Sequence, residues 1–211
     1  MNTENTNVWC ANGLDFEYAG QVLLKNWSLA SSPGVMLVSD EEGAYKTGFL
    51  RLLAGRLPYL SGSMSLRGVR HDADGQGYCA QVFWVDPVTA EYDQLVVDEF
   101  FSLQAARFAG FDAVYLATLV EGLALESHRH KQFFMLSAGT KRKVWIATAL
   151  ASGAPLTLLD EPFAALDKTS VRFVLRQFKS FAEGCGRLLV LGDYLAPPEV
   201  PLVTSLHLTS I

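Results

Sequence analysis

The sequence predicts an α/β fold in which a mixed β-sheet is flanked by helices. Three short segments, residues 35–38, 156–159 and 187–191, are almost entirely apolar, and they alternate with stretches whose apolar residues recur at helical spacing. Strands that are apolar on both faces indicate a parallel sheet covered by helices on both sides. Residues 62–68, which alternate between two glycines, predict a strand of a small N-terminal antiparallel part.

The composition restricts the class of protein. The chain has 211 residues, of which 50% are hydrophobic and 18% are charged, and its net charge is −5. This length suits one well-packed domain over residues 1–211, and the negative charge argues against a nucleic-acid partner. Cys10, Cys79 and Cys185 are too widely spaced for a disulfide framework, which suggests a reducing compartment.

The N-terminus and the hydropathy pattern also carry an expectation about location. The first residues are polar and lack both the basic start and the apolar core of a signal peptide. No stretch reaches the roughly 18 consecutive apolar residues that a membrane-spanning helix needs. We therefore expect a soluble cytoplasmic domain.

Helical patterns place the remaining elements. We expect helices over residues 49–57, 141–151 and 168–183, the second of them capped by Ser137. Residues from about 90 to 135 carry only helical patterns, so they are expected as a helical subdomain. That subdomain would be inserted into a core formed by residues 1–90 and 136–211.

The first candidate site follows the apolar segment at 35–38. Residues 40–47 (DEEGAYKT) fit the frame of a P-loop, GxxxxGK followed by Ser or Thr. In such a loop backbone N–H groups bind phosphates, the lysine reaches the outer phosphates and the hydroxyl binds Mg²⁺. Asp40 and Tyr45 stand where the pattern has its glycines, and Gly43 remains. A turn that caps a helix explains this stretch equally well.

Two further features are polar residues beside predicted elements. Gln81, in GYCAQVFWVDP, closes an apolar strand or is simply a residue at the edge of a loop. Ser137 and Gly139 precede the helix at 141–151, where a hydroxyl and free N–H groups suit an anion. An ordinary helix N-cap uses the same residue types.

The last motif is a pair of carboxylates, Asp160 and Glu161, at the end of the apolar segment 156–159. One of two such carboxylates suits Mg²⁺, and the other suits the orientation of an attacking water. A solvated strand end is the alternative. Ligands bind at the carboxyl ends of parallel strands, which favours a catalytic edge.

In this order and spacing the motifs resemble the nucleotide-binding domain of ATP-binding cassette (ABC) transporters over nearly the whole chain. LSAGT at residues 136–140 stands at the family's LSGGQ signature, LTLLDEP at 156–162 at Walker B, and AALD at 164–167 at the D-loop. Gln81 matches the Q-loop, and Tyr18 matches the aromatic residue that stacks on adenine. The short chain is also similar to the ATP-binding subunit of the haem exporter of cytochrome c maturation.

The resemblance implies that ATP and Mg²⁺ bind between two such domains arranged head to tail. It also assigns a role to each matched residue. The nucleotide is expected at Tyr18, Gly43, Ala44, Tyr45, Lys46, Thr47 and Gly48, Mg²⁺ at Thr47, Gln81 and Asp160, and catalysis at Glu161 and Gln81. Ser137, Ala138, Gly139 and Asp167 are expected to act on the nucleotide of the second subunit.

The resemblance also implies a membrane partner. The aromatic stretch at residues 82–87 (VFWVDP) lies where the family docks its transmembrane subunit. This partner would hold the chain on the inner face of the membrane.

Two departures from the family pattern weaken the site on this chain's own P-loop. Asp40 and Tyr45 replace glycines that need positive φ or a close approach to phosphate, with an expected strain of about 1–2 kcal/mol per residue. The carboxylates of Asp40, Glu41 and Glu42 are each expected to repel a polyphosphate by about 1–2 kcal/mol at ~8 Å and an effective dielectric near 20.

The second departure is the switch histidine, or H-loop residue, whose position is held by Asp193. The histidines of this chain, His71, His128, His130 and His207, lie elsewhere in the sequence. The HRH segment at 128–130 suggests either a metal site or a solvated loop before the signature.

These motifs predict the ATP-binding subunit of a membrane importer or exporter, paired with a second subunit, identical or different, and weakened at its own P-loop. A non-hydrolysing interaction subunit is the alternative, favoured by the altered P-loop and the missing histidine. Asp160, Glu161 and Tyr18 speak against that alternative. Soluble family members that act in translation or DNA repair usually carry two cassettes or a coiled-coil insertion, so they fit this chain less well.

Overall fold

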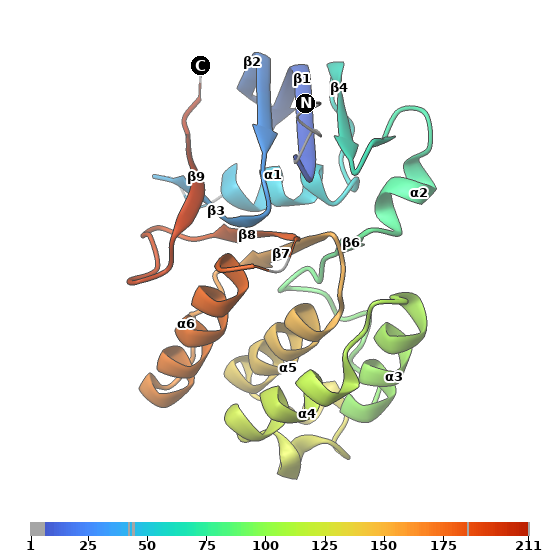
Figure 1. Ribbon diagram of the computed structural model, residues 1–211, viewed down its shortest axis with the longest axis vertical. Coiled ribbons are helices and arrows are strands. Elements are labelled where there is room, and N and C mark those ends of the chain that lie inside the picture. Colours follow the sequence, from blue (N-terminus) through green and yellow to red (C-terminus); the bar gives the residue numbers. More distant parts are fainter. Residues whose placement is uncertain (1–6, 42, 44, 185, 211) are drawn as a thin grey trace.

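The computed structural model describes residues 7–41, 43, 45–184 and 186–210 (Figure 1). Its strands are β1 (Trp9–Tyr18), β2 (Gln21–Ser31), β3 (Gly34–Asp40), β4 (Ser61–Leu66), β5 (Val69–Arg70), β6 (Val82–Phe83), β7 (Leu156–Asp160), β8 (Leu188–Gly192) and β9 (Leu202–Leu208). Its helices are α1 (Tyr45–Leu53), α2 (Gly75–Cys79), α3 (Val97–Arg107), α4 (Ala113–Gly122), α5 (Ala138–Ala151) and α6 (Lys168–Ala182), with the 3₁₀ turns η1 (Glu126–His128) and η2 (Phe133–Met135).

The central layer is a parallel sheet with the strand order β6-β7-β8-β3-β9. Side chains of β8 alternate between its two faces: Leu188 and Val190 belong to the core shared with α1, and Leu189 and Leu191 to the core shared with α5 and α6. This alternation explains why the strand is apolar at nearly every position. The predicted fold class, a sheet flanked by helices with an antiparallel part, is confirmed.

The antiparallel sheet, in the order β2-β1-β4-β5, lies on the α1 side of the parallel sheet (Figure 1). The predicted strand at 62–68 is β4. Tyr78 of α2 fastens this layer to α1, because its hydroxyl accepts a hydrogen bond from Trp9 Nε1 (2.9 Å) and donates one to the Leu53 carbonyl (2.9 Å).

On the opposite side of the parallel sheet, α3 and α4 pack against α5, and α6 lies beside them (Figure 1). The aromatic rings of Phe100 and Phe133 meet at 5.1 Å between centroids in this lower layer. Residues 97–135 form α3, α4, η1, η2 and the turns between them, with a bridge between Gln132 and Val96, so the helical stretch expected from about residue 90 begins at residue 97. In the described part of the chain, no helix is both long and apolar enough to cross a membrane.

The strand expected to end at Gln81 is wrong. Residues 75–79 form α2 instead, whose N-cap Asp74 accepts a hydrogen bond from the Gly77 N–H (2.8 Å). Such a cap favours a helical turn here, and β6 begins only after Gln81.

The carboxyl ends of three strands meet at one edge of the parallel sheet. Gly192 at the end of β8 pairs with Val38 of β3 on one side and with Asp160 of β7 on the other. This register brings the loop after β3, the Asp160–Glu161 pair and the segment after β8 to the same place.

Candidate nucleotide site

The loop between β3 and α1 forms the centre of this edge. Asp40 is the last residue of β3 and Tyr45 the first of α1, so both belong to regular elements with negative φ. The turn itself uses Gly43, whose φ is 78°. The backbone strain expected at Asp40 and Tyr45 is therefore wrong, since a glycine takes the left-handed position.

The side chain of Asp40 turns back into this loop. It is 4% exposed. Its Oδ1 accepts a hydrogen bond from the Gly43 N–H (3.0 Å), and its Oδ2 accepts from the N–H groups of Tyr45 (2.6 Å) and Lys46 (3.0 Å). Glu41 is exposed. Ala44 and Glu42, which the sequence placed at the phosphates, lie outside the described residues.

Lys46 is held by groups of its own chain. Its side chain is 0% exposed, and Nζ lies 3.6 Å from Asp40 Oδ1 and 3.2 Å from Glu161 Oε1. Nζ also donates to the Gly43 carbonyl (3.1 Å) and sits 3.9 Å from the ring centroid of Tyr194. Burial opposes the charge, but the contacts with Tyr194, Glu161 and Asp40 outweigh it and raise the pKa of Lys46. The lysine is therefore ionised and neutralised internally.

Thr47 and Asp160 form the part of the site that suits a metal ion. Thr47 Oγ1 donates to Asp160 Oδ2 (2.6 Å), while Asp160 Oδ1 is buried without a hydrogen-bond partner among the described residues. Burial raises the pKa of Asp160, and the hydrogen bond from Thr47 partly offsets this. A hydroxyl beside an unpartnered buried carboxylate oxygen fits the oxygen ligands that Mg²⁺ prefers.

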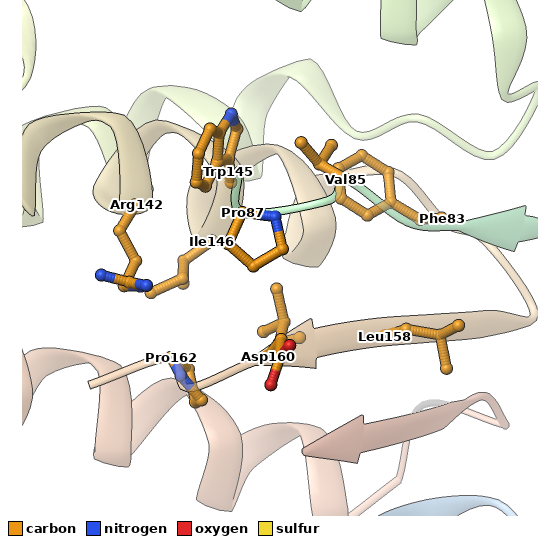
Figure 2. Close-up of a pocket in the computed structure, with 10 residues that line it drawn as sticks. Phe83, Val85, Pro87, Arg142, Trp145, Ile146, Leu158, Asp160 and Pro162 are labelled. Atoms are coloured by element: carbon orange, nitrogen blue, oxygen red, sulfur yellow. The ribbon is translucent and has the colours of Figure 1, made fainter. Parts of the chain in front are cut away.

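A cleft of about 280 Å³ lies next to this pair. Its lining consists of Thr47, Arg51, Asp86, Pro87, Val88, Arg142, Asp160 and Glu161. Figure 2 shows a neighbouring pocket that shares Asp160, Pro87 and Arg142 with this cleft, with Asp160 at the end of the β7 arrow and below Arg142 and Trp145 of α5. The space beside Thr47 and Asp160 can therefore admit a hydrated ion.

Glu161 and Asp193 flank the lysine. Glu161 adopts a positive φ of 46°, and its N–H donates to the Gly192 carbonyl (2.8 Å). Its side chain is 38% exposed, and its Oε1 is paired with Lys46. Burial, with a smaller effect of the Glu161 charge, raises the pKa of Asp193. The structure thus brings both residues to the same edge.

Tyr18 and Gly48 are brought together beside α1. A Cβ built on Gly48 would lie 2.5 Å from the Tyr18 ring, so the ring packs directly on the helix backbone. Arg51 Nη1 donates to the Tyr18 hydroxyl (3.3 Å). Gly48 is therefore required for the close approach of the ring.

Gln81, which was expected to bind the metal and to act in catalysis, is not brought to this edge in this structure. Its carbonyl accepts from the Leu156 N–H (3.3 Å) at the start of β7, and its side chain donates to the Gly77 carbonyl (3.1 Å). Asp160 lies four residues further along β7, about 13 Å away at 3.3 Å per residue.

Asp86, rather than Gln81, lies at this edge of the sheet beside Thr47 and Asp160. It follows β6, lines the cleft with Thr47 and Asp160, and its Oδ2 accepts from Arg51 Nε (3.1 Å) and Nη2 (2.8 Å). Asp86 was not among the site residues predicted from the sequence. The rule that ligands meet the carboxyl ends of parallel strands, applied to the short strand before Asp86, would have found it.

The signature residues form a separate unit at the start of α5. Ser137 is the N-cap, and its Oγ accepts from the Thr140 N–H (3.2 Å) while remaining exposed, as is Ala138. Gly139 is buried against the D-loop, because an added Cβ would lie 2.3 Å from the Ala165 carbonyl oxygen. The capping role predicted for Ser137 is confirmed.

Asp167 completes this unit as the N-cap of α6. Its carboxylate accepts from the Ser170 N–H (2.8 Å) and pairs with Lys143 of α5 (2.8 Å). The hydrogen bonds from Lys143 and Ser170 lower the pKa of Asp167. In α5, Arg142 Nη1 donates to the Ala164 carbonyl (2.8 Å), so the D-loop is tied to α5 at several points.

The histidine segment before the signature shows no metal-binding arrangement. His130 Nδ1 lies 3.7 Å from Asp98 Oδ2, and His128 Nδ1 lies 3.3 Å from Lys131 Nζ. Within the described ranges, no cluster of three or more His, Cys, Asp or Glu residues could hold a metal ion.

Comparison with known proteins agrees with this geometry. Residues 24–164 match the protein family described as ABC transporter. The chain is 30% identical over 181 residues to the cytochrome c biogenesis ATP-binding export protein CcmA of Pseudomonas savastanoi, covering 85% of each chain. It is 34% identical over 155 residues to the taurine import ATP-binding protein TauB of Escherichia coli, covering 72% of this chain and 59% of the relative.

One solved structure agrees with this assignment, and a second shares the fold. An ATP-binding subunit of an ABC transporter superposes with a TM-score of 0.74 at 25% identity, covering 88% of this chain and 79% of the other. A Pyrococcus furiosus protein described as a putative ABC transporter ATP-binding protein has the same fold (TM-score 0.71, 19% identity, 95% and 96% covered). The chain belongs to the ABC transporter family, as an ATP-binding subunit.

Proposed function

We propose that this chain is the auxiliary member of an unequal pair of ATP-binding subunits that drives a membrane transporter. ATP-binding subunits of this family dimerise and work with membrane subunits. The observation that carries the proposal is the contrast between two parts of the chain. The signature and D-loop are open and well formed, whereas the P-loop is closed by Asp40 and the charge of Lys46 is neutralised internally.

In this arrangement the chain contributes to the nucleotide of its partner. The exposed N-terminus of α5 offers N–H groups and the Ser137 hydroxyl to a phosphate. Gly139 allows this helix to lie against the D-loop, and Asp167 holds the D-loop in place through Lys143 and Ser170. These residues bind and orient, while the partner's own P-loop carries the ATP.

On its own side, the chain keeps a metal-binding half without a matching phosphate-binding half. Thr47 and Asp160 would hold Mg²⁺, which polarises phosphate oxygens when bound with ATP. Glu161 is paired with Lys46, so the reaction assigned to this residue by the family pattern is not expected here.

We further propose a cytoplasmic location on the inner face of the membrane, through a transmembrane partner that docks near residues 82–87. The match to the cytochrome c biogenesis export protein covers 85% of each chain. The match to the taurine import protein covers 59% of that protein's length. This supports an export system over an import system.

A second function is a non-hydrolysing interaction subunit that only holds the complex together. The closed P-loop favours it as much as it favours the unequal pair. The two differ in one respect, which is whether turnover in the partner's site requires Ser137 and Gly139.

The test measures ATP turnover of the assembled transporter with Ser137→Ala or Gly139→Ala in this chain. Ser137→Ala removes a hydroxyl donor to a developing phosphate charge, and the Cβ added by Gly139→Ala would push the start of α5 away from the Ala165 carbonyl oxygen. Each variant is expected to lower turnover about tenfold to hundredfold. The matched control is Gly75→Ala, a helical glycine whose added Cβ meets nothing within 4 Å. Unchanged turnover in a normally assembled Ser137→Ala complex would reject the unequal pair and leave the interaction subunit.

A further inference from the structure

We infer that the Asp40 carboxylate is a built-in anion that fills the phosphate-binding loop, and that Asp40 thereby makes this site reject nucleotide polyphosphates. The inference deepens the proposed function and rests on it for the role of the chain within a pair. It concerns the specificity of this chain's own P-loop, which the family pattern assigns to ATP.

Asp40 accepts hydrogen bonds from the backbone N–H groups that a P-loop offers to a phosphate. A P-loop binds phosphate through backbone N–H groups that converge where the loop enters its helix. Here the N–H groups of Gly43, Tyr45 and Lys46 converge on the two carboxylate oxygens of Asp40, at 3.0, 2.6 and 3.0 Å. An anion already accepts the hydrogen bonds that a phosphate would need.

The lysine of the loop is also occupied by groups of its own chain. In a P-loop the lysine extends to the outer phosphates. Lys46 instead lies buried against Asp40 and Glu161, with the Tyr194 ring over its ammonium group. Two carboxylates already face its single charge, so a polyphosphate entering here would meet net negative charge.

The position of Asp40 in the sheet keeps its carboxylate in the loop. As the last residue of β3 it pairs with Leu208 of β9, and its neighbour Ser39 pairs with His207. The backbone is thus fixed by the sheet, and a carboxylate fixed this close to its donors competes at a high effective concentration. A Cβ on Gly43 would lie 2.8 Å from the Tyr194 hydroxyl, so Tyr194 also covers the loop.

The side chain of aspartate is suited to filling the loop in place of a phosphate. Asp side chains accept hydrogen bonds from N–H groups a few residues further along in turns. The glycine that the motif normally has at this position lacks any side chain that could do so. One replacement, glycine by aspartate, therefore supplies both the anion and its correct position.

The test is calorimetric titration of the isolated full chain with inorganic pyrophosphate and with Mg-ATP, comparing wild type with Asp40→Gly and Asp40→Asn. Wild type is expected to give no binding up to millimolar concentration. Each variant is expected to bind at least tenfold more tightly, and Lys46→Ala added to Asp40→Gly is expected to abolish the gain. The control is Asp74→Asn, which alters another carboxylate that accepts from a backbone N–H, at the start of α2.

Micromolar binding by wild type that Lys46→Ala removes would overturn the inference, as would folded Asp40 variants that bind no better than wild type. If the variants do not fold, the amide signals of Tyr45 and Lys46 in wild type decide. They should be unchanged by millimolar Mg-ATP, and a saturable shift would contradict a filled loop. Because only the isolated chain is used, failure here leaves the proposed action of Ser137 on a partner untouched.

Discussion

The P-loop and the signature both lie at the N-terminus of a helix, and in both a side chain that precedes the helix accepts a hydrogen bond from at least one N–H of its first turn. Asp40 does this for α1 and Ser137 for α5. Asp40 is charged and buried, so it saturates the donors and neutralises Lys46. Ser137 is neutral and exposed, so it leaves the end of α5 accessible.

The comparison shows that the same local motif can close or open an anion site. What differs is the charge of the capping side chain and its depth in the fold. At the P-loop the cap completes a buried ion cluster that contributes to the fold of the isolated chain. At the signature the cap holds a surface ready for another molecule.

The largest expected effect comes from breaking the buried cluster. Lys46→Ala leaves Asp40 buried without its counter-charge, and removing one partner of a buried ion pair lowers stability by about 3–5 kcal/mol. Chemical denaturation of the isolated chain measures this loss. The matched control is Lys25→Ala, which removes an exposed pair with Asp15 (2.7 Å) and is expected to change stability by less than about 1 kcal/mol. Equal, small losses for both variants would show that Lys46 is free, as in an open P-loop.

A smaller effect is expected from the metal-binding half. Burial raises the pKa of Asp160, with contributions in the same direction from Glu161 and Asp86, while Thr47 and Lys46 oppose the shift. A raised pKa means that the folded state holds its proton more tightly than the unfolded chain. Stability is therefore lost as the pH rises from the ordinary value of 3.8 through the raised pKa.

Asp160→Asn removes this loss. Without Mg²⁺, the stability of the variant relative to wild type is expected to increase from acidic to neutral pH in denaturation experiments, and added Mg²⁺ should reverse the order. Asp15→Asn is the opposite control, because the hydrogen bonds from Asn26 and Lys25 lower the pKa of Asp15. Its disadvantage should appear at neutral pH and vanish in acid. A flat pH dependence for Asp160→Asn would mean that this carboxylate is well solvated.

Much of the fold could be predicted because it depends on patterns that extend over many residues. The apolar runs of β3, β7 and β8 and the cap at Ser137 are of this kind. The short helix α2 was missed because five residues are too few to show a helical period, and the strand boundary at Gln81 was wrong for the same reason.

The sequence predicted which residues lie at the candidate site better than it predicted the contacts that they make there. The carboxyl ends of parallel strands meet at one edge of the sheet, and the predicted residues gather there, as expected. They are Lys46, Thr47, Asp160, Glu161 and Asp193. The direction of the Asp40 side chain was not foreseen. Asp40 was expected to face a bound phosphate as a repelling charge, whereas its carboxylate accepts hydrogen bonds from the N–H groups of its own loop.

The most direct test counts the nucleotides bound to the assembled pair of ATP-binding subunits. Native mass spectrometry with a non-hydrolysable ATP analogue and Mg²⁺ measures this number. An unequal pair, with the loop of this chain filled by Asp40, predicts one nucleotide per pair, and the pairs that assemble with Lys46→Met in this chain should carry the same number. Two nucleotides per pair, one of them lost with Lys46→Met, would contradict it.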